Sequence, residues 1–255
     1  MQIADRTILI TGGASGLGAA CARTMLAVGA NVVIADLNCQ QGGAIAAEAP
    51  DRTAFVETDV AEGASVQCAV QTATDRFGEL AGVVHCAGIV AGSRIVGREG
   101  PHDLDLFSRV VRVNLVGTFN VLRLAAAVIS GRQPDEEGER GVIVLTASVA
   151  AFEGQIGQAA YAASKAGVAG LTLPAARELA AFGIRVVTIA PGIFDTPLMA
   201  GLPEGVRESL ARQPAFPQRF GQPEEFAALA QHVFENRMLN GTVLRLDGGL
   251  RMAAK

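Results

Sequence analysis

Short apolar segments alternate along the chain with longer segments in which apolar residues recur with helical periodicity. The short segments, which are rich in β-branched residues and which we expect to form strands, are residues 7–11, 31–35, 53–58, 82–86, 141–146, 184–190 and 242–246. The longer segments, which we expect to form helices, include residues 18–28, 64–77, 106–129, 159–182 and 223–235. Most of the predicted strands are continuously apolar, which is typical of a parallel sheet covered by helices on both faces.

This alternation predicts an α/β protein with a Rossmann-like, doubly wound sheet of seven parallel strands and helices on both faces. No Pro/Ser-rich linker or internal repeat divides the chain, so we expect a single domain over residues 1–255. In such a sheet, ligands bind beyond the carboxyl ends of the strands. We expect the first part, roughly residues 1–145, to bind a cofactor and the rest, roughly 146–255, to carry catalysis and the substrate.

The composition argues against several classes of function. The chain has 255 residues, of which half are hydrophobic, and a net charge of −4. Because it has no basic cluster, it offers no electrostatic basis for binding nucleic acid or a membrane surface. No apolar run approaches the roughly 20 residues of a membrane-spanning helix, and no charged-then-apolar leader is present.

Cysteine and histidine spacing favours a reduced, metal-free protein. No Cys-x-x-Cys motif is present, which indicates an intracellular protein rather than a disulfide framework. The three histidines do not cluster at metal-ligand spacing, so we expect no metal site. Together with the composition, these features predict a soluble cytoplasmic protein. The cysteines are Cys21, Cys39, Cys68 and Cys86.

The first predicted strand leads directly into a glycine-rich turn, and a helix follows the turn. Glycines at positions 12, 16 and 18 permit a tight turn and close approach of the backbone to a pyrophosphate, to which the helix N-terminus supplies amide donors. The spacing differs from the usual Gly-x-Gly-x-x-Gly. This turn predicts a dinucleotide site that includes Gly12, Ser15, Gly16, Leu17 and Gly18.

Asp36, at the end of the second predicted strand, indicates which dinucleotide is bound. A carboxylate there can accept hydrogen bonds from the adenosine ribose hydroxyls and would repel a 2′-phosphate. No arginine or lysine lies at residues 13–15 or 37–39 to bind such a phosphate. We therefore predict NAD rather than NADP. The alternative role for Asp36 is that of a helix N-cap.

Tyr161, the only tyrosine of the chain, precedes Lys165 by one helical turn. Residues at i and i+4 share a helix face, so the Lys165 ammonium would stabilise the Tyr161 phenolate and lower its pKa from about 10. A phenol tuned in this way is a candidate general acid/base for interconverting a hydroxyl and a carbonyl. The alternative is a packing contact with a solvated lysine.

The glycine-rich turn, Ser148 after the fifth predicted strand and Tyr161-x3-Lys165 together resemble the short-chain dehydrogenase/reductase family over residues 7–252. The resemblance implies a catalytic set of Asn114, Ser148, Tyr161 and Lys165. It also implies that residues at three strand ends line the cofactor, with Tyr161 and Lys165 beside it. These are Asp59, Val60, Cys86, Ala87, Gly88, Pro191, Gly192, Phe194 and Thr196.

Residues 146–197 resemble, more narrowly, the subgroup of this family that acts on 3-hydroxyacyl-CoA thioesters. The resemblance implies NAD-dependent interconversion of a 3-hydroxyacyl-CoA, such as 2-methyl-3-hydroxybutyryl-CoA, and the 3-oxoacyl-CoA, in the degradation of fatty acids and isoleucine. It assigns Ser148, Gln155 and Tyr161 to the substrate, and a water in a proton relay to Asn114. It also implies a homotetramer.

Three other functions remain as alternatives. One is a steroid or secondary-alcohol dehydrogenase with a broad apolar pocket. A carrier-protein reductase of the family is opposed by Asp36, because such enzymes usually prefer NADPH. A nucleotide-binding scaffold would need none of the catalytic residues.

The proline-rich segment 197–217 is either a lid over the site or a surface connection.

Overall fold

Seven strands form one parallel sheet in the computed structural model, which describes residues 1–98, 100–201 and 203–254. Along the sheet the strands lie in the order β3-β2-β1-β4-β7-β8-β9. Their bounds are β1 (Thr7–Thr11), β2 (Asn31–Asp36), β3 (Thr53–Glu57), β4 (Gly82–His85), β7 (Gly141–Thr146), β8 (Ile184–Pro191) and β9 (Val243–Leu246). The predicted α/β class and all seven parallel strands are confirmed. Strands from both predicted parts of the chain share this sheet.

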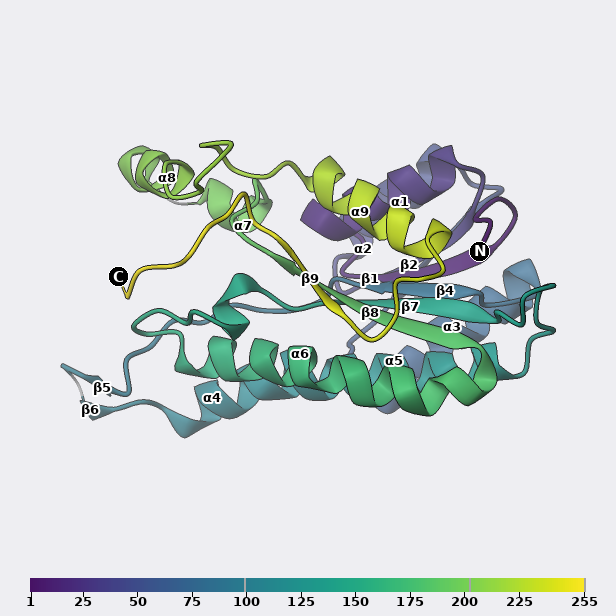
Figure 1. Cartoon of the computed structure of the whole chain (residues 1–255), viewed down its shortest axis with the longest axis horizontal. Helices are drawn as coiled ribbons and strands as arrows, with labels where there is room; N and C mark the ends of the chain where they lie inside the picture. The colour runs from purple at the N-terminus through teal and green to yellow at the C-terminus, as the bar shows by residue number, and fades with distance from the viewer. Residues whose placement is uncertain (99, 202, 255) are drawn as a thin grey trace.

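Helices cover both faces of the sheet (Figure 1). On one face lie α1 (Gly16–Ala27), α2 (Cys39–Glu48) and α9 (Pro223–Glu235). On the other face lie α3 (Gly63–Phe77), α5 (Gly117–Ser130) and α6 (Ala159–Leu179), with α4 (Leu104–Val111) before α5. The strands are apolar on both faces because each face is buried under helices.

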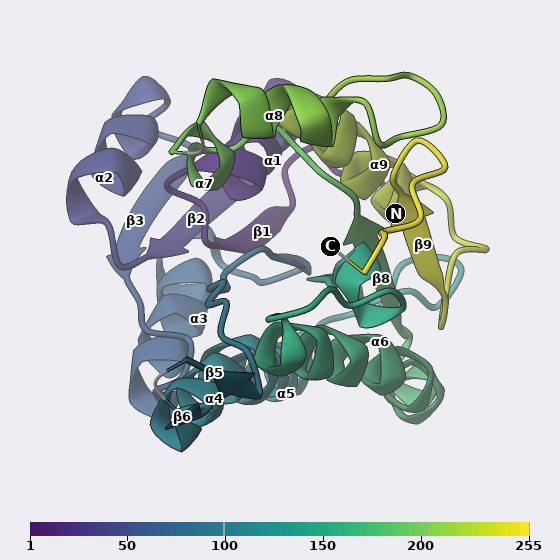
Figure 2. The same cartoon turned by 90° about the vertical axis from the view of Figure 1, so that its left-hand side faces the viewer.

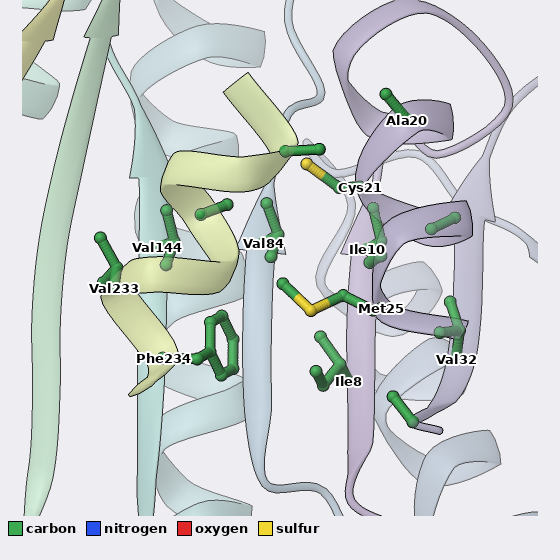
Figure 3. Packing of buried hydrophobic residues seen from close by; sticks show 14 of the residues in the cluster. Ile8, Ile10, Ala20, Cys21, Met25, Val32, Val84, Val144, Val233 and Phe234 are labelled. Atoms are coloured by element: carbon green, nitrogen blue, oxygen red, sulfur yellow. The ribbon is translucent and has the colours of Figure 1, made fainter. Parts of the chain in front are cut away.

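The core under α1 and α9 shows how the two helices approach the sheet (Figure 3). Ile8, Ile10 and Val84 of the strands contact Met25 of α1 and Phe234 of α9, and all five are fully buried. Gly82 leaves room for the Phe234 ring, since an added Cβ would overlap it. Burial of this kind is the main stabilising contribution, about 1.5–3 kcal/mol for each large apolar side chain.

Several elements differ from the sequence prediction. The predicted helix 106–129 is interrupted by a π-helical turn at Arg112–Val116, between α4 and α5. Helix α2 was not predicted, because Gly42 and Gly43 lower its helix propensity; the Asn38 side chain caps it by accepting from the Gln41 amide. The short elements β5 (Val96–Gly97), β6 (Gly100–Pro101), α7 (Pro197–Ala200) and α8 (Glu204–Ala211) complete the fold.

The helical stretch Leu104–Ser130 corrects the expectation that no apolar run is long enough to span a membrane. It has 27 residues with a mean hydropathy of 1.5 in its most apolar window, so by length and composition alone it is a candidate span. Half of that window is buried inside the domain. A helix that contributes to a protein core has the same properties, because its inner face is apolar.

All strands point toward the same edge of the sheet. Figure 2 views the molecule from that side, where the β5–β6 hairpin, α7, α8 and the C-terminal segment surround the strand ends. The chain order reverses direction between β1 and β4, since the chain builds outward from β1 in both directions. A crevice at such a reversal is where doubly wound sheets bind their ligands.

Candidate active site

A cavity of about 500 Å³ lies at this edge of the sheet. Its volume falls within the roughly 300–1,000 Å³ of small-molecule sites. Its walls contain most of the predicted cofactor residues, from the glycine-rich turn to the start of α7. These are Gly12, Ser15, Gly16, Leu17, Gly18, Asp36, Asp59, Val60, Cys86, Ala87, Gly88, Tyr161, Lys165, Pro191 and Thr196. A more open cavity of about 610 Å³ between α1, α2 and α9 shares Ser15 and Gly16 but contains none of the predicted catalytic residues.

The glycine-rich turn between β1 and α1 is possible only with glycine at its key positions. Gly12 has φ +64°, and a Cβ added to it would lie 2.7 Å from the Ala87 nitrogen. A Cβ on Gly18 would overlap the Gly12 carbonyl. The turn therefore brings the backbone of β1, β4 and the α1 N-terminus together, as a pyrophosphate site requires.

Asp36 at the end of β2 contacts this turn directly. Its Oδ2 accepts a hydrogen bond from the Ala14 amide at 3.0 Å, and its Oδ1 accepts from the Asn38 amide at 3.0 Å. Asn38, and not Asp36, is the N-cap of α2. The alternative role as a helix cap is thus wrong, and the Asp36 carboxylate lies in the cavity wall beside the glycine-rich turn.

Tyr161 lies in the cavity wall, and Ser148 directly follows Ala147 of that wall without lining the cavity itself. Ser148 is the last residue before the 3₁₀ turn Val149–Ala151, and its Oγ accepts from the Ala150 amide at 3.2 Å. Ser148 is also near enough to the Tyr161 phenol to lower the pKa of that phenol. Ser148 therefore both caps a backbone turn, as a structural serine would, and contacts the candidate acid/base.

Lys165 lies one turn after Tyr161 on α6 and is buried. Its Nζ donates to the Thr146 carbonyl at 2.8 Å and lies 5.9 Å from the centre of the Tyr161 ring. Burial lowers the pKa of Lys165 to about 8, while the nearby Cys86 thiol raises it. The predicted helical pairing of Tyr161 and Lys165 is confirmed.

The predicted lowering of the Tyr161 pKa by Lys165 is not found in the protein alone. Burial raises the pKa of Tyr161, and the hydrogen bond with Ser148 lowers it by a smaller amount. The physical reason is that the buried phenol is desolvated, while the Lys165 ammonium is directed to the Thr146 carbonyl. A sequence shows the helical spacing but not the depth of burial.

This correction yields a direct test, because the chain has one tyrosine and no tryptophan. Phenolate absorbance against pH is expected to give a midpoint above that of a free phenol, since burial disfavours the charged form. Ser148→Ala should raise the midpoint further, because it removes the hydrogen bond that favours the phenolate. Lys165→Met should change it less than Ser148→Ala does, and the reverse order would contradict this account. With NAD bound, a midpoint still near 10 would argue against Tyr161 as the base.

Asn114 lies in the π-helical turn, fully buried, one layer behind the cavity wall. Its Oδ1 accepts from the Ile89 amide at 2.8 Å, and its Nδ2 donates to the Ile89 carbonyl at 2.9 Å and to the Ser164 Oγ at 3.1 Å. It therefore links the segment after β4 to α6. Turns of this type occur frequently at functional sites. That Asn114 supports a water in a proton relay stays a prediction.

Five predicted site residues do not line this cavity: Asn114 and Ser148, described above, and Gly192, Phe194 and Gln155. Gly192 packs against Asp247, where an added Cβ would be 2.9 Å from the Asp247 Cβ. Phe194 is buried in the core, edge-on to Phe226 with ring centres 6.4 Å apart. Gln155 lines a separate cavity of about 380 Å³, and its Nε2 donates to the Ala253 carbonyl at 3.2 Å. The Phe194 ring packs in the core and the Gln155 amide bonds to the Ala253 carbonyl, so neither side chain lines the cavity.

Other residues of the cavity wall were not predicted. They lie next to predicted residues in the sequence, where each strand turns into the following loop, so proximity to a strand end is the signal that finds them. Arg109 and Val113 are the exceptions, because they lie in α4 and in the π-helical turn after it, and only the packing of these helices brings them to the site. These residues are Ala35, Leu37, Thr58, Ile89, Val90, Arg109, Val113, Thr146, Ala147 and Pro197.

Segment 197–217 forms α7 and α8 at one side of the site. Its residue 202 lies outside the described residues. Arg207 of α8 donates to the Asp195 carboxylate at 3.0 Å and to the Met199 carbonyl at 3.1 Å. The lid therefore stays a prediction, as does the alternative of a surface connection. Within the part of the chain that the structure describes, no metal-ligating cluster of three or more side chains occurs.

Comparison with known proteins places these features in a family. Residues 6–207 match the short chain dehydrogenase family. The chain is 51% identical over 253 residues to 3-hydroxyacyl-CoA dehydrogenase type-2 of Drosophila melanogaster, covering 98% of this chain and 99% of that protein. It is 38% identical to ipsdienol dehydrogenase of Ips pini, covering 98% and 99%. A crystal structure of 3-hydroxyacyl-CoA dehydrogenase type-2 from Mycobacterium avium matches with a TM-score of 0.94 and 47% identity, covering 98% and 97%.

The fold and the site therefore define an oxidoreductase that uses a nicotinamide dinucleotide. The chain belongs to the short-chain dehydrogenase/reductase family, and within it is closely related to 3-hydroxyacyl-CoA dehydrogenase type-2. This confirms both resemblances that the sequence motifs indicated.

Proposed function

We propose that this chain is an NAD-dependent dehydrogenase that interconverts a 3-hydroxyacyl-CoA and the 3-oxoacyl-CoA. The observation that carries the proposal is the Tyr161 phenol, one turn from buried Lys165, in a cavity that also contains the glycine-rich turn. Substrate class is supported by the relative named 3-hydroxyacyl-CoA dehydrogenase type-2, which matches over nearly the whole chain.

The residues of the cavity fit a dinucleotide. The Gly12 and Gly18 positions leave no room for side chains where backbones meet, and the Asp36 carboxylate lies beside the turn. NAD, when bound, supplies the hydride acceptor. Since no cation lies at residues 13–15 or 37–39 to offset a 2′-phosphate, Asp36 supports NAD over NADP.

The chain's own residues would then manage the proton and the developing charge. Tyr161 would accept the substrate hydroxyl proton, and Ser148 would donate a hydrogen bond to the substrate oxygen. The Lys165 ammonium would bind the nicotinamide ribose. Asn114 would support a water in the proton relay and fix the segment after β4 against α6.

The substrate is tested by NADH production from NAD⁺ with 3-hydroxybutyryl-CoA, its 2-methyl analogue and a hydroxysteroid, measured side by side. We expect fast turnover of at least one thioester, because the acyl-CoA relatives match over the full chain. The ratio of the two thioesters tests a role in isoleucine degradation. Activity with the steroid alone, or with none of the three, would overturn the proposed substrate class.

A secondary-alcohol dehydrogenase is the second candidate. The relative from Ips pini, an ipsdienol dehydrogenase by name, matches over the same length at lower identity. Ile89, Val90 and Val113 give part of the cavity wall an apolar surface that such an alcohol could contact. The substrate panel separates the two candidates when ipsdienol is added. A nucleotide-binding scaffold is opposed by the placement of Tyr161 and Lys165 in the wall of one cavity, with Ser148 next to Ala147 of that wall.

We also propose a homotetramer in the cytoplasm, acting in the degradation of fatty acids and isoleucine. Support for assembly comes from exposed apolar side chains on the π-helical turn, α5 and α6: Val116, Phe119 and Leu173 are 51%, 49% and 44% exposed. Sedimentation equilibrium should give four times the 26.2 kDa chain mass, and a monomer would contradict the assembly. Cell fractionation tests the location.

A further inference from the structure

We propose that His85 is a positioning residue that ties the two cofactor-lining turns to the helix carrying Tyr161, as a neutral ring with its proton on Nε2. It lies at the end of β4 and is 1% exposed. Nothing in the proposed chemistry uses this histidine. The inference rests on the proposed function only for its kinetic test.

Both ring nitrogens of His85 are hydrogen-bonded to threonines on different elements. Nδ1 lies 2.7 Å from the Oγ1 of Thr11, the last residue of β1 before the glycine-rich turn. Nε2 lies 2.9 Å from the Oγ1 of Thr118, one turn after Asn114 in α5. The ring therefore bridges β1 and α5 from its place at the end of β4.

The direction of each hydrogen bond follows from counting protons. The Thr118 hydroxyl donates its one proton to the Asn114 carbonyl at 2.6 Å, so toward the ring it can only accept. Nε2 must then carry the proton, and Nδ1 must accept from the Thr11 hydroxyl. The Thr11 Oγ1 can then accept a hydrogen bond from the Ala87 amide at 3.4 Å.

A charged ring would disrupt this hydrogen-bond network, because it would present a second N–H to Thr11. Burial and the nearby Lys165 ammonium lower the pKa of His85 to about 3, so the ring stays neutral. A neutral imidazole is one donor and one acceptor at fixed positions, and the two threonine hydroxyls use both.

One branch of this hydrogen-bond network, through Thr11, reaches the cofactor-lining turns. Thr11 precedes Gly12, and the Ala87 nitrogen lies 2.7 Å from the place of a Gly12 Cβ. The Thr11 hydroxyl, held by His85, therefore sets the spacing between the turn after β1 and the turn after β4. We expect this branch to act on dinucleotide affinity.

The other branch reaches the acid/base. Thr118 fixes the carbonyl of Asn114, whose side chain bonds to Ser164, and the Ser164 hydroxyl donates to the Tyr161 carbonyl at 2.8 Å. We expect this branch to act on turnover rather than on dinucleotide affinity. A histidine that only filled space would not separate the two effects.

The tautomer is tested by ¹⁵N-¹H NMR of the ring nitrogens in the full chain with NADH bound. With three histidines in the sequence, His102→Gln and His232→Gln variants assign the spectrum. We expect one ring with an unprotonated Nδ1 and a slowly exchanging proton on Nε2. A proton on Nδ1, or an imidazolium, would overturn the proposal, and this test requires no substrate and no change at His85.

The two branches are separated with isosteric Thr→Val variants. Thr11→Val should raise the NADH Kd about tenfold and leave kcat near the wild-type value, while Thr118→Val should lower kcat about tenfold and leave the NADH Kd nearly unchanged. Thr172→Val is the matched control, because that buried threonine on α6 bonds to Thr188 away from the site. It should alter neither quantity.

Equal effects of Thr11→Val and Thr118→Val on both quantities, or no effect of either, would overturn the inference. If a variant does not fold, the NMR measurement on the unaltered chain decides. If no hydroxyacyl-CoA is turned over, the proposed function fails, but the tautomer and the NADH affinities still test His85.

Discussion

Replacing Tyr161 with phenylalanine is expected to abolish measurable turnover while leaving NADH affinity nearly unchanged. The change removes one hydroxyl group, and it leaves the ring beside Lys165, 5.9 Å from its ammonium. No other phenol exists in the chain to replace it. Loss of a general acid/base costs about 10²–10⁴ in rate. NADH absorbance gives kcat, and fluorescence titration gives the NADH Kd.

Ser148→Ala is the matched comparison for this variant. It removes a hydrogen bond to the substrate oxygen but keeps the phenol, so the loss should be smaller than that of Tyr161→Phe. A Tyr161→Phe protein with more than about a tenth of wild-type kcat would rule out the acid/base assignment. Parallel loss of NADH affinity would instead indicate that the substitution disturbs the cavity.

The strands could be predicted almost to the residue, and so could the position of the site. Each strand of the sheet is buried on both faces, so its sequence is a short apolar run with few alternatives. The glycine-rich turn, Asp36 and Ser148 all follow strands directly. In a parallel sheet the strand ends meet at one edge, and this brings residues from distant parts of the sequence into one cavity.

The features that could not be predicted depend on tertiary contacts. The break between α4 and α5 falls at Asn114, whose side chain bonds to Ile89 and Ser164 in other segments. The apolar pattern of the helix is the same with or without that turn. Phe194 was assigned to the cofactor by resemblance, but its ring packs on Phe226 in the core.

The pKa values of the site residues also depend on tertiary structure that the sequence does not show. Helical spacing correctly pairs Tyr161 with Lys165, but the sequence does not show that both side chains are desolvated. Burial raises the pKa of Tyr161 and lowers that of Lys165 to about 8, which moves the two values apart. In the protein alone, burial therefore favours the neutral form of both side chains.

Replacing Asp36 with alanine is expected to remove the preference for NAD over NADP. The Asp36 carboxylate lies in the cavity wall at the end of β2, and a 2′-phosphate beside it would place like charges together. Such contacts cost several kcal/mol, and each 1.4 kcal/mol is a factor of about ten. The ratio of kcat/KM for NAD to that for NADP should therefore fall by about 100-fold or more. Parallel assays with both cofactors measure it.

Asp36→Asn separates charge from support of the glycine-rich turn. The carboxylate accepts from the Ala14 and Asn38 amides, both at 3.0 Å, and alanine loses both bonds whereas asparagine keeps an acceptor of the same shape. If charge sets the preference, both variants should lose it, and only Asp36→Ala should also bind NAD more weakly through a loosened turn. An unchanged NAD preference in Asp36→Asn would show that the carboxylate acts through the turn.

Adding Leu37→Arg, at a position 64% exposed on the cavity wall, should then favour NADP, because the guanidinium supplies the cation that residues 37–39 lack.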